Sequence, residues 1–239
     1  MKTALVTGGA MRVGRAISLA LAAEGMRVVV HYNSSSSEAD ALVEEIRRGG
    51  GEAAAIGADL SRVEEVRRLA DEAPRIFGGI DVLVNNASVF PAERLEETDE
   101  ALWDHTLAVN LRAPFFLIRH LAPVLRERRG VVVNLCDLAG IQAWGAYAAH
   151  GISKAGMVHL TKVAARSLAP EVRVNGIAPG AVLPPESMGP DELVALERST
   201  PLRRLGSPGD VVRAVLYLLH ADYVTGEILV VDGGRMLRG

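Results

Sequence analysis

A glycine-rich turn near the start of the chain is the first stretch whose residue types suggest chemistry. Residues 7–14 read Thr-Gly-Gly-Ala-Met-Arg-Val-Gly, and an amphipathic segment follows them. Glycines between a strand and a helix allow a tight bend and a close approach of the backbone to a ligand. The first N–H groups of the helix then present a positive dipole end to that ligand. We therefore predict a dinucleotide site here, with Gly8, Arg12, Val13 and Gly14 at the pyrophosphate.

This turn requires a strand before it and a helix after it, and the rest of the chain repeats that alternation. Runs rich in β-branched residues predict strands at 4–7, 27–31, 53–57, 81–85, 131–135, 172–177 and 228–231. Amphipathic segments predict helices at 14–24, 36–48, 62–73, 99–127, 152–168 and 209–220. Ser35 and Ser61 each precede a Glu by three residues, as in a capping box, and 207–210 is a similar helix start. The pattern predicts an α/β fold, a single Rossmann-type doubly wound parallel sheet with helices on both faces.

The chain shows neither a linker nor an internal repeat, so residues 1–239 are predicted to form a single domain. The least regular stretch is an insertion at about 181–209, which is rich in Pro and Gly. An insertion after the carboxyl end of a strand in such a sheet is a candidate substrate lid. An ordinary surface loop is the alternative.

Composition limits the classes of protein that fit. The 239 residues are 49% hydrophobic with a formal net charge of −3, which does not fit the basic surface of a nucleic-acid binder. No signal segment is visible, and no apolar run reaches the ~18 residues of a membrane helix. The single cysteine, Cys136, fits a reducing cytoplasm. His105, His120 and His159 have no partners at metal-ligand spacing, so no metal site is expected.

The end of the second predicted strand bears on which nicotinamide cofactor is bound. Enzymes that use NAD usually place an acid there to bind the ribose 2′-hydroxyl. Here His31-Tyr32-Asn33-Ser34 leads into three more serines, and the first carboxylate is Glu38. A 2′-phosphate would meet hydroxyls, an amide and a helix start, so we predict NADP(H), bound in part by His31, Tyr32, Asn33 and Ser34. Arg15 or His31 is the expected source of positive charge.

Further motifs follow in order along the chain: Asp59-Leu60, Asn85-Asn86-Ala87, Asn110, Asn134-Leu135, Lys154, Pro179-Gly180 and Val231-Asp232-Gly233-Gly234. Together with the glycine turn they resemble the short-chain dehydrogenase/reductase family over essentially the whole chain. The resemblance implies a nicotinamide-dependent oxidoreductase. It also implies further cofactor contacts from Asp59, Leu60, Asn86, Ala87, Pro179 and Gly180.

The resemblance also implies a proton donor, a tyrosine four residues before a lysine on one helix. That spacing puts both side chains on one face. Lys154 stands at the lysine position, which binds the nicotinamide ribose, but His150 stands where the tyrosine is expected. Tyr147, seven residues before Lys154, lies two turns away. Asn110 is implied to hold a water for proton delivery, and Asp137 takes the place of the usual serine.

Several departures from the family pattern resemble the pteridine reductases. Arg12 replaces the middle glycine of the turn, and Asp137 replaces the serine. Ser88 and Phe90 follow the Asn-Asn-Ala motif, where an aromatic ring opposite the nicotinamide would sandwich a flat pterin. Arg12 offers a planar guanidinium to a phosphate or a substrate ring. The pteridine reductases carry an Arg near the position of Ser34, which this chain lacks.

His150 leaves two possibilities open. An imidazole can donate one hydrogen bond when neutral and two when protonated, and its reference pKa of ~6.5 lies near neutrality. His150 is therefore either a working acid or water-positioning group, or a substitution that weakens the reaction.

The leading hypothesis is an NADPH-dependent reductase of the pteridine reductase type. Asp137, with His150 or water, delivers the proton, while Arg12, Ser88, Phe90 and Tyr147 bind the substrate. One alternative is a 3-oxoacyl-carrier-protein reductase or another carbonyl reductase. Another is a catalytically silent NADP-binding protein. The resemblance also implies a homotetramer.

Overall fold

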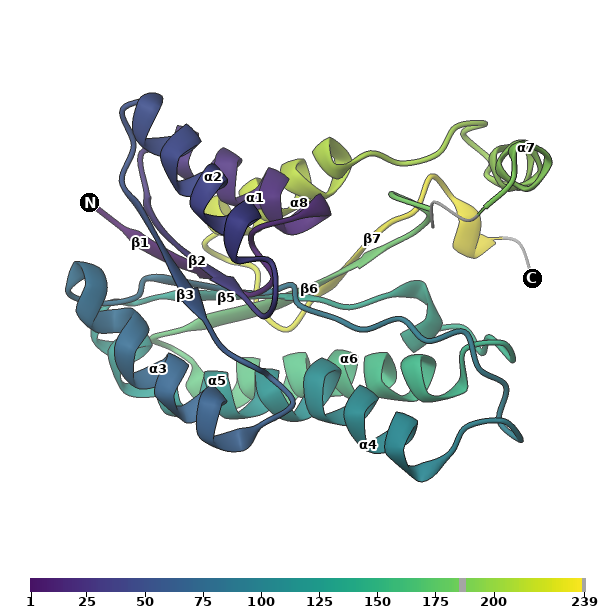
Figure 1. The fold of residues 1–239 in the computed structure, drawn as a ribbon, viewed down its shortest axis with the longest axis horizontal. Coiled ribbons are helices and arrows are strands. Elements are labelled where there is room, and N and C mark those ends of the chain that lie inside the picture. Colours follow the sequence, from purple (N-terminus) through teal and green to yellow (C-terminus); the bar gives the residue numbers. More distant parts are fainter. Residues whose placement is uncertain (185–187, 238–239) are drawn as a thin grey trace.

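The computed structural model describes residues 1–184 and 188–237, and in them seven parallel strands form one sheet (Figure 1). The strands are β1 (Thr3–Val6), β2 (Arg27–Tyr32), β3 (Ala53–Gly57), β4 (Val82–Asn85), β5 (Val131–Leu135), β6 (Arg173–Pro179) and β7 (Ile228–Val231). Their order across the sheet is β3-β2-β1-β4-β5-β6-β7. The order reverses direction between β1 and β4, which is where ligands bind in open α/β sheets.

Helices cover both faces of this sheet (Figure 1). One face carries α1 (Arg12–Ala23), α2 (Ser36–Arg48) and α8 (Pro208–His220), and the other carries α3 (Val63–Phe77), α5 (Ala113–Glu127) and α6 (Ala148–Leu168). The short α4 (Glu100–Leu107) continues into α5 through a π-helical turn, η1 (Ala108–Arg112). Helix α7 (Pro190–Ser199) lies apart from both layers. Short 3₁₀ turns are η2 (Leu138–Gly140) and η3 (Arg235–Leu237).

The strands are apolar along nearly their whole length because both of their faces are buried. In β1, Leu5 packs into the core on one side of the sheet, while Ala4 and Val6 pack into the core on the other. This is the expected pattern for parallel strands covered by helices on both faces. The two cores hold the strand ends in fixed positions, so loops at the carboxyl edge start from a rigid frame.

The predicted fold class is confirmed, and every predicted strand lies within two residues of its observed position. The predicted helix 99–127 is interrupted by η1, and α7 was not predicted. The capping boxes at Ser35 and Ser61 are wrong. The Ser35 hydroxyl instead contacts the sulfur of Met11, and α3 begins after Arg62. The start at Ser207 is confirmed, because Asp210 and Ser207 form a capping box.

Candidate active site

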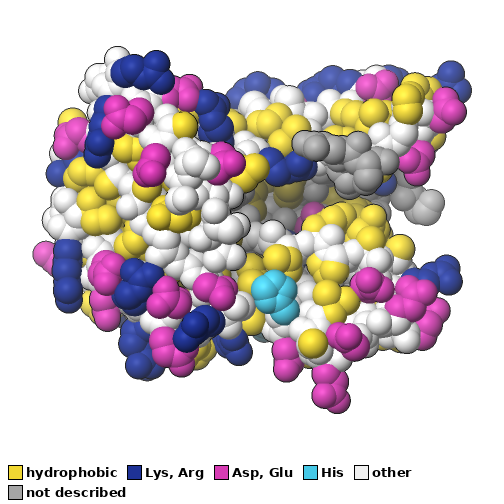
Figure 2. All heavy atoms as spheres, viewed as in Figure 1, with side chains coloured by type: hydrophobic (Ala, Val, Ile, Leu, Met, Phe, Trp, Pro, Cys, Tyr) yellow, Lys and Arg dark blue, Asp and Glu magenta, His cyan; other side chains and the backbone are white. Residues whose placement is uncertain are grey.

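Two adjoining cavities lie at the carboxyl edge of the sheet, where the surface is hollowed between two groups of elements (Figure 2). The first, about 370 Å³, follows the glycine turn, β2 and α4. The second, about 620 Å³, lies over the ends of β5 and β6 and the start of α6. Arg12, Val13, Asn86 and Ser88 border both. A ligand can therefore extend from one cavity into the other.

The glycine turn is built by close backbone packing. Gly8 has a left-handed φ of +59°, and Asn86 donates from its side-chain amide to the carbonyls of Thr7 (2.8 Å) and Gly8 (3.1 Å). A Cβ on Gly14 would lie 2.1 Å from the Gly8 carbonyl oxygen. Helix α1 can approach the turn this closely only with glycine at that position. No side chain caps the helix at Met11, which leaves first-turn N–H groups for a phosphate.

Arg12 occupies the middle position of the turn with a φ of +50°. This backbone region favours glycine, so the arginine is held there at a cost of about 1 kcal/mol. Its guanidinium donates a 2.7 Å hydrogen bond to the carbonyl of Leu183, at the start of the predicted lid. Arg12 thus joins the phosphate-binding turn to the segment that covers the second cavity.

His31 lines the first cavity but does not supply the positive charge expected of it. Its Nδ1 accepts a hydrogen bond from the Gly8 N–H (3.1 Å), and its Nε2 lies 2.9 Å from the Ala58 carbonyl, to which it donates. Burial lowers the pKa of His31 to about 4, so the ring is neutral near pH 7. Arg15, the other expected source, forms an ion pair with Glu45. Neither residue therefore offers an unpaired charge to a 2′-phosphate.

The low pKa of His31 predicts a loss of stability as the pH falls from about 6.5 to about 4. In this range the unfolded chain binds a proton at His31 that the folded protein does not, so unfolding becomes more favourable. The full effect is about 3 kcal/mol, reached near pH 4. Urea unfolding at stepped pH measures it. His31→Gln is expected to flatten this part of the curve, and identical pH slopes for both proteins would contradict the assignment.

The adenosine end of the first cavity is polar. Its wall combines the end of β2 with the end of β3, and the residues are Tyr32, Asn33, Ser34, Ser35, Asp59 and Leu60. Helix α2 begins at Ser36, and no side chain caps it, so its first N–H groups remain for an anion. His105 on α4 also borders this cavity, although it was predicted to be an ordinary helical residue. The position of His105 in the cavity wall follows from tertiary packing, which the local sequence pattern does not show.

Asp137 and His150 face each other in the second cavity. Asp137 follows β5, and His150 lies in the first turn of α6. The His150 Nδ1 is 3.1 Å from the Val89 carbonyl, which can only accept, so Nδ1 carries the proton. Its Nε2 is buried without a hydrogen-bond partner among the described residues and lies 3.7 Å from an Asp137 carboxylate oxygen. The two side chains are thus within ion-pair distance of each other but form no direct hydrogen bond.

The two members of this pair differ in access to the cavity. The side chain of Asp137 is 22% exposed, whereas that of His150 is 2% exposed. The other Asp137 oxygen accepts a hydrogen bond from the Ala139 N–H (2.8 Å), which fixes the carboxylate at the start of η2. Asp137 is therefore the member of the pair that a ligand in the cavity can reach more readily.

Asn110 sits in the π-helical turn η1 and organises the floor of the cavity. Its amide nitrogen donates to Ser153 and to the Val89 carbonyl, both at 3.0 Å. Its oxygen accepts from the Val89 N–H (2.8 Å) and lies 3.1 Å from the Ser88 hydroxyl. These protein partners account for both amide hydrogens and for the oxygen of the side chain. The water-holding role that the family resemblance implies stays a prediction. Asn110 positions the carbonyl that fixes the tautomer of His150.

Lys154 lies one helical turn after His150, as the i, i+4 spacing predicts. Its Nζ donates to the Leu135 carbonyl (2.7 Å) and borders the second cavity. Burial lowers the pKa of Lys154, and the neighbouring Cys136 and Asp137 oppose this shift. Burial also raises the pKa of the Cys136 thiol to about 11, so Cys136 is a buried neutral group, as expected.

An aromatic wall closes one side of the second cavity. Phe90 stacks on Tyr147 with ring centroids 4.5 Å apart, and it meets the His150 ring edge-on at 4.4 Å. Trp144 meets Tyr147 edge-to-face, with ring centroids 6.1 Å apart. Phe90 is 45% exposed, so it is not a core ring under a loop. Pro179 and Gly180, at the end of β6, border the same cavity.

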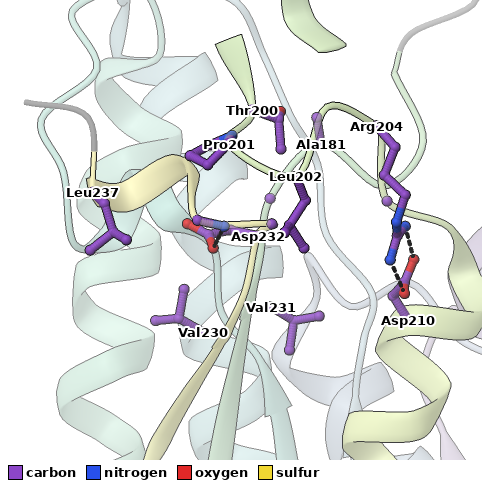
Figure 3. A pocket seen from close by; sticks show the side chains of 14 residues that line it. Ala181, Thr200, Pro201, Leu202, Arg204, Asp210, Val230, Val231, Asp232 and Leu237 are labelled. Atoms are coloured by element: carbon purple, nitrogen blue, oxygen red, sulfur yellow. Dashed lines mark hydrogen bonds and ion pairs between the residues drawn. The ribbon is translucent and has the colours of Figure 1, made fainter. Parts of the chain in front are cut away.

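The predicted lid begins after β6, and residues 185–187 of it lie outside the described residues. Its helix α7 contributes Leu196 to the second cavity but contains no buried residue. A further cavity of about 480 Å³ is bordered by the end of β7 and shares Gly180 and Ala181 with the second cavity (Figure 3). There Arg204 donates two 2.9 Å hydrogen bonds to Asp210 and holds the pKa of that carboxyl below its usual value. This ion pair fixes the base of the lid.

A crevice of the dinucleotide-binding type adjoins a buried lysine and the Asp137–His150 pair, the arrangement of a nicotinamide-dependent oxidoreductase. A family model described as enoyl-(acyl carrier protein) reductase matches residues 8–235. The chain is 37% identical to the 3-oxoacyl-(acyl-carrier-protein) reductase FabG of Staphylococcus epidermidis over 99% of each protein. It is 38% identical to 3beta-hydroxysteroid dehydrogenase 1 of Eggerthella lenta, over 99% of this chain and 94% of that one.

Solved structures agree with this class. FolM alternative dihydrofolate reductase 1 from Brucella suis, solved in complex with NADP, has a TM-score of 0.94 and 36% identity, covering 100% of this chain and 96% of that one. The enzyme of the same description from Brucella canis, also complexed with NADP, has a TM-score of 0.92 and 36% identity. The match covers 100% of this chain and 95% of that one. The chain belongs to the short-chain dehydrogenase/reductase family.

No helix of the described residues has the length and apolar character needed to cross a membrane.

Proposed function

We propose that the protein is an NADPH-dependent reductase of a pterin-like heterocycle. The observation that carries the proposal is the pairing of Asp137 with the buried Nε2 of His150, 3.7 Å apart, beside an aromatic wall. A carboxylic acid that holds a proton suits delivery to a ring nitrogen, whereas the hydroxyl of a serine suits a carbonyl oxygen. The NADP complexes of the Brucella relatives, described as alternative dihydrofolate reductases, support the same reading.

The residues of the first cavity fit an NADP(H) molecule. The cradle between Gly8 and Gly14 has no room for a Cβ, and the uncapped starts of α1 and α2 offer N–H groups to the pyrophosphate and the 2′-phosphate. Asp59 and Leu60 would flank the adenine, and Lys154 would hold the nicotinamide ribose. When bound, the reduced cofactor supplies a hydride.

The chain's own groups then position the substrate and move a proton. Phe90 and Tyr147 would hold a flat ring, and Ser88 and Arg12 would bind its polar edge. His150 keeps its Nδ1 proton on the Val89 carbonyl, so it acts on the substrate through Asp137 and does not donate directly. Asp137 releases the proton of the pair into the cavity.

Consumption of NADPH with a panel of substrates tests this function. Purified protein is mixed with NADPH, and the loss of its absorbance is followed with dihydrobiopterin, dihydrofolate or an acetoacetyl thioester. We expect oxidation with at least one dihydropterin. Oxidation with the thioester alone would overturn the pterin proposal. No oxidation with any substrate, despite measured NADPH binding, would favour a catalytically silent protein.

A carbonyl reductase is the second candidate, and the relationship to FabG favours it. That relative is described as a 3-oxoacyl-(acyl-carrier-protein) reductase and aligns over 99% of this chain. Asp137 in the serine position and the Phe90 ring in the cavity are the observations against it.

We also propose that the protein is a cytoplasmic homotetramer. Phe115, Ile152 and Val163 are 46%, 47% and 46% exposed on α5 and α6, although all three are apolar. Phe115 and Val163 border a groove between these helices. Exposed apolar patches of this kind mark association surfaces. Light scattering coupled to size-exclusion chromatography determines the mass, and a monomer would contradict the proposal.

A further inference from the structure

Arg235 borders the substrate cavity and is held there by its own turn. Gly233 and Gly234 have left-handed φ values of +67° and +87°, which turn the chain sharply after β7. The Asp232 carboxylate then accepts hydrogen bonds from the N–H groups of Gly234 (2.7 Å) and Met236. These contacts fix the start of η3 and with it the direction of Arg235.

A second set of contacts joins η3 to the aromatic wall. The Arg235 guanidinium lies over the Trp144 ring, 5.8 Å from its centroid. The Gln142 side chain donates to the Met236 carbonyl at 3.3 Å. Stacking on an aromatic face holds a guanidinium while leaving its edge N–H groups for other partners.

The described residues that line the cavity include three cationic side chains, Arg12, Lys154 and Arg235, and these differ in the hydrogen bonds that they form. Lys154 donates to the Leu135 carbonyl, and Arg12 donates to the Leu183 carbonyl. The Arg235 guanidinium forms neither a hydrogen bond nor an ion pair with the residues that the structure describes. Among the described residues, its charge is therefore available to a ligand in the cavity.

The aromatic wall runs from the Asp137–His150 pair to this arginine. His150 contacts Phe90, Phe90 stacks on Tyr147, and Tyr147 contacts Trp144, with centroids 4.4, 4.5 and 6.1 Å apart. Arg235 lies beyond Trp144. A complementary ligand therefore has a flat ring at one end, an aromatic spacer and an anion at the other end.

We propose that Arg235 binds a carboxylate on an aryl tail of the substrate and so selects tailed pterins over pterins with a short neutral side chain. This inference rests on the proposed pterin reductase function. The residue acts on substrate affinity and takes no part in proton delivery, since Asp137 and His150 perform that step.

The test compares two dihydropterins that differ in the tail. Dihydrofolate carries an aryl spacer and carboxylates, and dihydrobiopterin carries neither. Arg235→Gln is expected to lower kcat/KM for dihydrofolate about tenfold, mainly through KM, because a charge-assisted hydrogen bond is lost. The value for dihydrobiopterin is expected to stay within about twofold. Arg235→Lys, which keeps the charge, should recover part of the loss. Added salt should reduce the difference in kcat/KM for dihydrofolate between the wild-type protein and Arg235→Gln, because it screens the interaction between the two charges.

Arg94→Gln is the matched control, since this arginine is 67% exposed and lies outside the cavity lining. Arg94→Gln should leave kcat/KM unchanged for both substrates. Thermal melting should show that every variant is folded. Equal effects of Arg235→Gln on both pterins, or no effect on dihydrofolate, would overturn this inference alone. Failure of the wild-type protein to reduce either pterin would overturn the proposed function, and this inference with it.

Discussion

Asp137→Asn is expected to lower kcat for dihydropterin reduction by about 10²–10⁴-fold, the range for loss of a general acid. The amide oxygen can still accept the Ala139 N–H, so the start of η2 should be preserved. The amide cannot store and release a proton, and that is the function removed. Steady-state oxidation of NADPH measures kcat, and NADPH affinity is measured separately by fluorescence. The affinity should stay within about twofold.

A second variant tests whether Asp137 acts together with His150. His150→Phe keeps a ring edge-on to Phe90 but removes both nitrogens. If the pair holds one shared proton, the double variant should be little worse than Asp137→Asn alone, because residues that act as a unit are not additive. Glu96→Gln, an exposed carboxyl outside the cavity lining, is the control. Full activity of Asp137→Asn, or strictly additive losses, would contradict the shared-proton assignment.

Gly14→Ala is expected to cost 3 kcal/mol or more of unfolding free energy, at or above the top of the ~1–3 kcal/mol range for overpacking. The added Cβ would lie 2.1 Å from the Gly8 carbonyl oxygen and 2.6 Å from the Asn86 amide nitrogen. Relief of this overlap requires α1 to move away from the turn. The N–H groups that face the pyrophosphate move with it, so the Kd for NADPH should rise at least about tenfold, a change of ~1.4 kcal/mol.

Gly209→Ala is the matched control, because Gly209 also lies in the first turn of a helix. Its added Cβ would approach nothing closer than 3.5 Å, an ordinary contact. Alanine favours helix formation over glycine, so this variant should be neutral or slightly stabilising. Urea unfolding measures both variants. A Gly14→Ala protein as stable as the wild type would show that the turn has more room than the structure gives it.

The sheet was predictable because its strands are buried on both faces and are therefore almost wholly apolar. Helix α7 was missed for the opposite reason. It contains no fully buried residue, and its short apolar stripe, Leu193 and Leu196, lies in a stretch otherwise rich in Pro and Gly, which is typical of a loop. The predicted start of the helix at Ser36 was right, but the capping contacts expected of Ser35 and Ser61 were wrong, because a capping pattern does not determine which partner the hydroxyl contacts.

The candidate site was predictable as a set of residues but not as a set of bonds. The spacing of His150 and Lys154 on one helix follows from the sequence. The tautomer of His150 does not, since it depends on the Val89 carbonyl, 61 residues away in the chain. The neutrality of His31 likewise depends on burial between the glycine turn and Ala58, which a local pattern cannot show.

The absence of buried residues in α7 has a consequence for how the predicted lid would move. The free energy that holds a segment in place comes largely from the apolar surface it buries, and α7 buries little. Its opening can therefore occur as a local unfolding event, separate from the cooperative unfolding of the sheet. The segment is held at its two ends by side-chain contacts. Arg12 donates a hydrogen bond to the Leu183 carbonyl at one end, and Arg204 pairs with Asp210 at the other. The cavity can thus exchange its contents while the strands that carry the reacting groups stay in register.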